Sequence, residues 1–393
     1  MKSRCHSEER QRRGILAAWV PKSLGPDKPA RFFAAVRMTS FGLGLILLAS
    51  CGGTAAPASS AQTASSGKPT TPEAIAAYQG ADRQQVLEDG AKKEGSLQFY
   101  TSLAGDVVQA IADRFQQKYP YVKVEVYRGN GDDLLTRITQ EQSAKKPIAD
   151  VIHGDEDTVA QLNGAKALVP YYSPGAAQIP TDDLDPASGG LNYDVMNTVL
   201  YMSFAYNTKS LPESAVPKTY QDLLNPALKG KMAITGTGNS GPRWVGTVVG
   251  AAGEDVIHKM AQQEAVQVQL VAAKAVMDLI SSGEVVASPT IFRDHTQQAV
   301  DAGAPVKWVP LEPVVGGFSG LGMLAGAPHP NAAMLFLDWA LGADFKQVQV
   351  DYHMGNPSVD PGFKTARPGH GLSLADRTKA FQTWQSLLRE FGS

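Results

Sequence analysis

The stretch between residues 96 and 168 alternates between strand-like and helix-like segments, and this alternation limits the chain to few folds. The runs at 96–102, 122–127 and 149–153 are typical of strands. Apolar residues at helical spacing follow each run, at Val107, Val108, Ile111 and Phe115, then at Leu134, Leu135 and Ile138, and then at Val159, Leu162 and Leu168. Such alternation predicts an α/β fold with a parallel sheet covered by helices on both faces. Ligands of these sheets bind at the carboxyl ends of the strands, here 100–102, 128–130 and 154–156.

The second half of the chain continues with strands and helices in a less regular order. Strands are expected at 200–206, 231–235, 285–287 and 306–309, and helices at 243–251, 270–281, 332–341 and 380–391. The sequence shows no repeat of 20–50 residues, which argues against a solenoid or a propeller. A length of 393 residues with 43% hydrophobic residues allows about two domains.

Residues 31–51 are typical of an export signal. Arg31 and Arg37 precede an apolar run at 41–49, which is far shorter than the ~20 residues of a membrane span. The sequence at 48–51 resembles a bacterial lipobox, so Cys51 is the expected lipidation site; an ordinary signal peptide with an incidental cysteine is the alternative. We therefore expect a signal peptide at 1–50; residues 1–30 suggest that the translation start is assigned too far upstream. We also expect a lipoprotein held in the periplasm or on the outer face of the cell envelope.

Residues 51–92 are expected to form a flexible tether between the lipid and the folded body. The part from 52 to 71 is rich in Ala, Ser, Thr, Gly and Pro and offers little apolar surface to bury.

Charge and cysteine content exclude several classes of protein. The formal charge is −2, but residues 1–50 are basic and the remainder carries 27 basic and 35 acidic residues. An acidic body is a poor nucleic-acid binder. The two cysteines, Cys5 and Cys51, exclude a disulfide framework and any Cys-rich metal site, and the histidines show no metal-ligand spacing.

Six segments together resemble the bacterial extracellular solute-binding proteins of ABC importers, in the branch that includes the periplasmic ferric-ion-binding proteins. They lie at 91–102, 145–157, 206–213, 225–234, 282–292 and 322–339. The resemblance implies a type II fold of two α/β lobes with parallel or mixed sheets and a ligand cleft between the lobes. It places lobe one at 93–200 and 312–345, and lobe two at 201–311 and 346–393. It also implies a monomer that binds a small molecule and meets a membrane permease.

The turn at 236–244 carries the most information about the ligand. It follows a predicted strand and opens a helix, with Ser240 as the expected N-cap and Pro242 in the first turn. Such a helix start binds anions. The resemblance implies anion contacts at Ser240 and Gly241, with Arg243 able to add a charge and Asn239 as a neighbouring candidate. A merely capped structural helix is the alternative.

The glycines at 236, 238 and 241 also match a dinucleotide fingerprint, with Asp255 as its acid. This match is weak, because 253–255 reads as a turn that ends a helix, whereas the fingerprint needs its acid at the end of a second strand.

The resemblance departs from the iron-binding pattern near residue 293. Where those relatives carry an adjacent tyrosine pair, this sequence has Arg293 and Asp294, and a guanidinium binds carboxylates or phosphates rather than cations. Asp155 stands where the acidic iron ligand falls. The sequence therefore predicts a site for an organic anion without metal or cofactor, and ferric iron or an iron chelate stays as the alternative.

The full expected site combines both lobes. Its members are Tyr100, Thr101, Ser102, Asp155, Asn239, Ser240, Gly241, Arg243, Arg293 and His295. For Arg293, Arg243 and His295, ordinary surface roles remain open. No nucleophile elbow, metalloprotease motif or P-loop is present, so an enzyme, in the form of a secreted hydrolase, is the least favoured reading. The acids at 155–157 are expected to complement a helix dipole.

Overall fold

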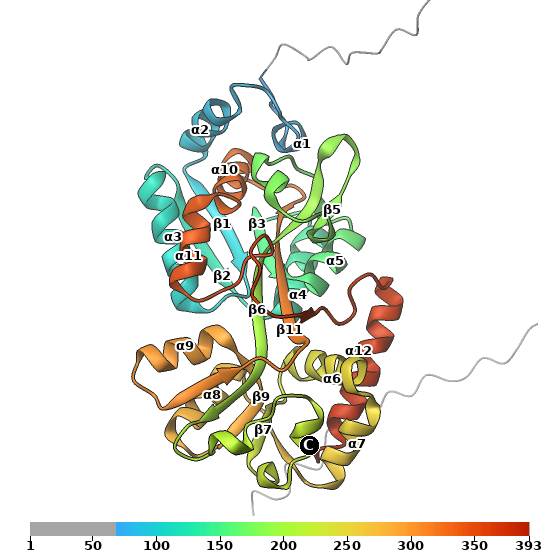
Figure 1. The fold of residues 1–393 in the computed structure, drawn as a ribbon. Coiled ribbons are helices and arrows are strands. Elements are labelled where there is room, and N and C mark those ends of the chain that lie inside the picture. The colour runs from blue at the N-terminus through green and yellow to red at the C-terminus, as the bar shows by residue number, and fades with distance from the viewer. Residues whose placement is uncertain (1–67, 393) are drawn as a thin grey trace, which may run out of the picture. The chain divides into compact units, whose positions relative to one another are not determined.

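A computed structural model describes residues 68–392, and every structural statement below refers to them (Figure 1). The predicted signal peptide, Cys51 and the tether up to residue 67 lie outside this range.

One mixed sheet runs through the described chain in the order β2-β1-β3-β11-β6-β9-β7-β8. Its strands are β1 (Ser96–Thr101), β2 (Lys123–Arg128), β3 (Val151–Asp155), β4 (Leu168–Val169), β5 (Leu184–Pro186), β6 (Asn192–Asn207), β7 (Met232–Thr235), β8 (Val266–Gln269), β9 (Ala287–Phe292), β10 (Val306–Val309), β11 (Val314–Leu324) and β12 (Thr365–Ala366). Strands β1, β2 and β3 are parallel to one another, and so are β7, β8 and β9, whereas β6 and β11 pair antiparallel. The predicted α/β class with a mixed sheet is confirmed.

The helices are α1 (Pro72–Ala76), α2 (Arg83–Glu94), α3 (Gly105–Lys118), α4 (Gly131–Ser143), α5 (Glu156–Gly164), α6 (Ser240–Ala252), α7 (Glu254–Gln262), α8 (Ala273–Ser282), α9 (Arg293–Asp301), α10 (Pro330–Ala340), α11 (Ala343–Asp351) and α12 (Leu374–Arg389). Helix α3 buries Val107, Ile111 and Phe115 on one face, as their spacing predicts. Helix α10 is apolar almost all round and is buried accordingly.

Two large clusters of buried apolar side chains define two lobes. The first lobe packs around Phe99, Phe115 and Phe336, with helices α2, α3, α10 and α11. The second lobe packs around Phe204, Trp244 and Ile257, with α6, α7 and α12. Strands β6 and β11 contribute residues to both clusters, and we call them the hinge strands.

Two predicted boundaries need correction. The span expected to be tether, up to residue 92, includes α1 and most of α2, because Ile75, Leu87 and Ala91 bury their side chains in the first lobe. The predicted start of the last lobe-two segment at 346 is too early: Val348 and Met354 still belong to the first apolar cluster. The chain then returns to the second lobe through residues 355–373, which lie between α11 and α12 and which we call the crossing segment.

Local structure around residue 240 also differs from the prediction. Asn239, not Ser240, is the N-cap of α6, and its side chain makes no capping hydrogen bond. Gly253 ends α6 with a positive φ of 86°, but Glu254 starts α7 at once. Asp255 therefore lies in the first turn of a helix and not at the end of a strand, where the dinucleotide fingerprint requires its acid.

Candidate functional site

The amino end of α5 gathers carboxylates at the edge of the first lobe. Asp155 ends β3 and accepts hydrogen bonds from the backbone N–H groups of Asp157 and Thr158, both at 3.1 Å. It is thus the N-cap of α5, and Glu156 and Asp157 occupy the first turn. The predicted role of this acidic run as a complement to the helix dipole agrees with this geometry.

Arginines from the second lobe bind this acidic helix start. Arg243 of α6 lies 2.7 Å from an Asp157 carboxylate oxygen and 3.5 Å from one of Asp155. Arg377 of α12 lies 3.1 Å from Asp157 and 3.5 Å from Glu156. Since α6 and α12 pack in the second lobe, these ion pairs join the two lobes.

The crossing segment adds a further set of ion pairs. Arg367 lies 2.7 Å from Glu156 and 2.6 Å from Asp183, and His370 lies 2.9 Å from Glu156. Burial alone would raise the pKa of Glu156, but Arg367, His370 and Arg377 together hold it below its usual range. Glu156 is therefore an ionised carboxylate shared by three basic side chains.

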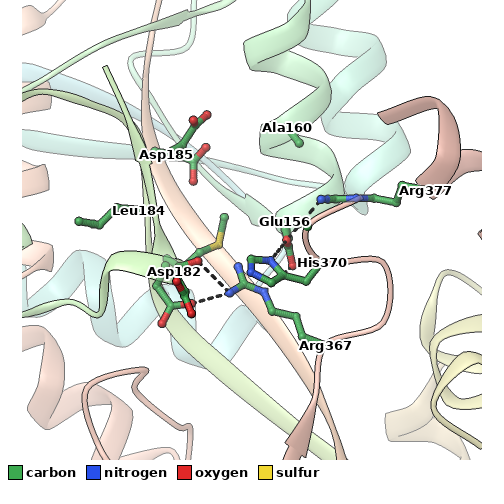
Figure 2. A pocket seen from close by; sticks show the side chains of 12 residues that line it. Glu156, Ala160, Asp182, Leu184, Asp185, Arg367, His370 and Arg377 are labelled. Carbon is green, nitrogen blue, oxygen red and sulfur yellow. Dashed lines mark hydrogen bonds and ion pairs between the residues drawn. The ribbon is translucent and has the colours of Figure 1, made fainter. Parts of the chain in front are cut away.

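A cavity of about 260 Å³ opens beside these ion pairs (Figure 2). Its lining residues come from α5, the 3-10 turn at Thr181–Asp183, β5, β6, the crossing segment and α12. They are Glu156, Ala160, Asp182, Asp183, Leu184, Asp185, Asp194, Met196, Arg367, His370, Gly371 and Arg377. We call it the acidic pocket. Figure 2 shows Asp182 and Asp185 across the pocket from Arg377.

Arg293 occupies a different environment at the start of α9. Its guanidinium carbon lies 4.8 Å from the centre of the Tyr201 ring and 6.0 Å from that of Phe363. It has no ion pair with any residue of the range 68–392. Burial raises the pKa of the Tyr201 hydroxyl, and the Arg293 charge opposes this shift.

A family model described as "Bacterial extracellular solute-binding protein" matches residues 110–364, well over half of the chain. This chain belongs to the bacterial extracellular solute-binding proteins. The two-lobed reading of the sequence is confirmed at the level of family and fold, and members of the family are solute-binding transport proteins.

Individual relatives of this solute-binding protein differ in what they are named for. An uncharacterised protein of Haemophilus influenzae is 26% identical over 272 residues, which cover 67% of this chain and 78% of that protein. The "Fe(3+)-binding periplasmic protein" of Serratia marcescens is 23% identical over 268 residues, covering 66% and 77%.

Solved structures share the fold at low identity. AfuA of Actinobacillus pleuropneumoniae, with exogenous fructose-6-phosphate bound, has a TM-score of 0.61 and 22% identity over 75% of this chain and 99% of that one. Iron-bound HitA of Pseudomonas aeruginosa has a TM-score of 0.60 and 21% identity over 76% and 99%.

The structure of the solute-binding protein brings some of the predicted site residues together. Strands β7 and β9 are parallel neighbours, so the Ser240–Gly241 turn after β7 and Arg293 after β9 follow carboxyl ends at one edge of the sheet. Asp155 and Arg243 meet each other across the lobes.

Arg243 and Arg293 do not form one cluster. Tyr201 pairs with Gly316 and Leu200 with Gly317 in the hinge, so Tyr201 and Gly317 face opposite sides of the ribbon. Arg293 stacks on Tyr201, whereas an Arg243 nitrogen lies 3.9 Å from where a Cβ on Gly317 would be. The expectation that Arg243 adds its charge to Arg293 is therefore wrong, since Asp155 and Asp157 already neutralise it.

Among the remaining predicted site residues, the hydroxyl groups of Tyr100 and Thr101 already form hydrogen bonds within the protein. Tyr100 is buried and donates to Glu141 at 2.7 Å inside the first lobe. Thr101 is buried too, and its hydroxyl accepts from the Leu103 N–H. Ser102 is half-buried, and Asn239 is exposed.

His295 lies 3.7 Å from Asp294, and its Nδ1 is buried without a hydrogen-bond partner among the described residues. Burial lowers its pKa. A neutral, half-buried imidazole of this kind adds no positive charge to an anion site.

The acidic pocket was not predicted from the sequence. The acid-rich run at 181–185 was a usable signal, but its arginine partner, Arg367, lies 184 residues after Asp183. Within residues 68–392, no three His, Cys, Asp or Glu side chains are arranged to hold a metal ion, and no helix is long and apolar enough to span a bilayer.

Proposed function

We propose that this solute-binding protein captures a small organic anion, such as a carboxylate, a phosphonate or a phosphorylated compound, and delivers it to an ABC permease. In this proposal Cys51 anchors a monomer by lipid in the periplasm or on the outer face of the envelope. The lobes close on the solute, and the permease recognises the closed conformation.

Arg293 is the observation that carries the proposal. A guanidinium keeps its charge at all physiological pH values and offers a planar fork of donors to a carboxylate or phosphate. The Arg293 guanidinium lies over the Tyr201 ring, with Phe363 packed against that ring, and lacks a carboxylate partner in the described chain. A positive group that is positioned but not neutralised favours an anionic ligand.

The start of α6 supports the same ligand class. The first N–H groups of a helix have no partner within the helix, and the helix dipole is positive there. Ser240 and Gly241 begin α6 at the same sheet edge as Arg293, but Gly241 is buried and Pro242 removes one donor, so this helix start offers few N–H groups. Arg293 would thus supply most of the binding energy.

Ferric iron or an iron chelate is the second candidate, because the Serratia marcescens relative is named as an Fe(3+)-binding protein. Asp294 favours it as well: its carboxylate is 7% exposed and one oxygen has no hydrogen bond in the described range. Arg293 opposes it, since a fixed positive charge beside the carboxylate disfavours a trivalent cation.

The test is calorimetric titration of the protein with citrate, inorganic phosphate and fructose 6-phosphate as probes. Arg293→Ala should weaken the tightest probe by roughly 100-fold, because losing a charge-paired contact costs about 2–5 kcal/mol. Arg389→Ala removes an exposed arginine of α12 and should leave the affinity unchanged. Equal affinity of Arg293→Ala and the unchanged protein, or no binding of any probe, would contradict the proposal.

A further inference from the structure

The acidic pocket carries more negative than positive charge. Its lining includes five carboxylates, from Glu156 to Asp194, against Arg367, Arg377 and His370. The two arginines are already engaged, Arg367 with Glu156 and Asp183, and Arg377 with Glu156 and with Asp157 outside the lining.

Three carboxylates of the lining remain without a cation, namely Asp182, Asp185 and Asp194. Asp185 accepts a hydrogen bond of 2.5 Å from the Asn163 amide. No residue of the described chain forms a salt bridge with any of the three. The pocket therefore offers negative charge that the protein itself does not balance.

Asp194 is the residue that points to a ligand. It lies on the hinge strand β6, is only 3% exposed and lines the pocket. Its carboxylate forms neither a hydrogen bond nor an ion pair with residues 68–392. Although the residue is buried, its carboxylate oxygens are not fully enclosed and open into the pocket, where a bound cation can pair with them.

The volume of the pocket and the side chains that line it indicate which kind of cation would fit. A cavity of about 260 Å³ lies below the usual range of drug-sized ligand pockets, so the ligand is small. Leu184, Met196 and Ala160 give the wall an apolar part, which suits an aliphatic chain. The acids are not arranged to hold a metal ion, which favours an ammonium head group that pairs with one carboxylate.

We propose that the acidic pocket binds a small aliphatic ammonium compound, whose charged nitrogen pairs with Asp194. Neither Arg293 nor Tyr201 lines this pocket, so the two proposed sites have no lining residue in common. Because the first lobe supplies Asp194 and the crossing segment supplies Arg367 and His370, the bound amine touches the link between the two lobes.

The experiment is calorimetric titration of the protein with n-butylammonium and 1,4-diaminobutane at pH 8 and low salt. Butyrate, with the same carbon chain and the opposite charge, and calcium chloride are the comparison ligands. In the Arg293→Ala variant, which lacks the proposed anion site, we expect saturable binding of the amines at one site and none of butyrate or calcium. Absence of amine binding, or calcium binding of similar strength, overturns the proposal.

Two matched variants locate the site. Asp194→Asn keeps the shape of the side chain and should weaken amine binding at least tenfold. Asp255→Asn removes an equal charge from an exposed position on α7 and should change nothing. An equal loss in both variants, or no loss in Asp194→Asn, assigns the binding to general surface charge and refutes the site. Should Asp194→Asn not fold, the comparison of butylammonium with butyrate on the Arg293→Ala variant still decides.

Discussion

Replacing Asp194 by asparagine should stabilise the protein by an amount that depends on pH. Burial raises the pKa of Asp194 from 3.8 to about 7, with the Asp185 and Glu156 carboxylates adding to the shift and Arg367 opposing it. The folded state therefore binds this proton more tightly than the unfolded chain does. Between pH 4 and 7 the folded state holds more protons, so stability falls as the pH rises through this window.

The size of the effect follows from the shift. Each pKa unit corresponds to 1.36 kcal/mol, and asparagine does not titrate. Relative to the unchanged protein, Asp194→Asn should gain about 2 kcal/mol at pH 5 and about 4 kcal/mol at pH 8. Urea unfolding followed by circular dichroism at both pH values measures the difference, provided that each curve shows one reversible transition.

Asp255→Asn is the control for this series, since its exposed side chain should shift stability by no more than about 0.5 kcal/mol at either pH. A gain for Asp194→Asn that is the same at pH 5 and pH 8, or a loss at pH 8, would show that Asp194 is not an unpartnered buried carboxylate.

Two further predictions concern the ligand class and the packing of α12. Titration with ferric citrate should produce no phenolate charge-transfer band, because Arg293 and Asp294 stand where iron-binding relatives carry tyrosines; such a band would restore the iron reading. Gly246→Ala should destabilise the protein by about 1–3 kcal/mol in urea unfolding, because its Cβ would lie 2.6–2.8 Å from the Trp384 ring. The control is Gly250→Ala, whose Cβ would meet nothing within 4 Å. This variant should be neutral or stabilising by up to ~1 kcal/mol. Equal effects of the two alanines would mean that α12 does not pack on α6 at this point.

Much of the fold could be predicted because local patterns decide it. The strands at 96–102 and 306–309 and the helix that buries Ile111 appear close to the predicted positions, since their apolar residues follow the period of the element. The hinge strand β11 was missed. Its glycines at 316, 317, 320 and 322 lower strand propensity, and only pairing with β6 and β3 makes it a strand.

The site was harder to predict, because ion pairs between distant segments decide it. The sequence shows that Arg243 is present, but not that Asp157 neutralises it from the other lobe. The acidic pocket likewise unites residues near 156, 183, 194 and 370, and no local pattern links these positions. Arg293 could be identified because it replaces a residue type that the family pattern expects.

The most direct test of the anion proposal is a crystal structure of the protein purified from its native host without denaturation. The account predicts density for a small anion between the lobes, with a carboxylate or phosphate group within hydrogen-bond distance of the Arg293 guanidinium. A metal ion bound by protein oxygens in that place, or a solute that leaves Arg293 without contact, would contradict it.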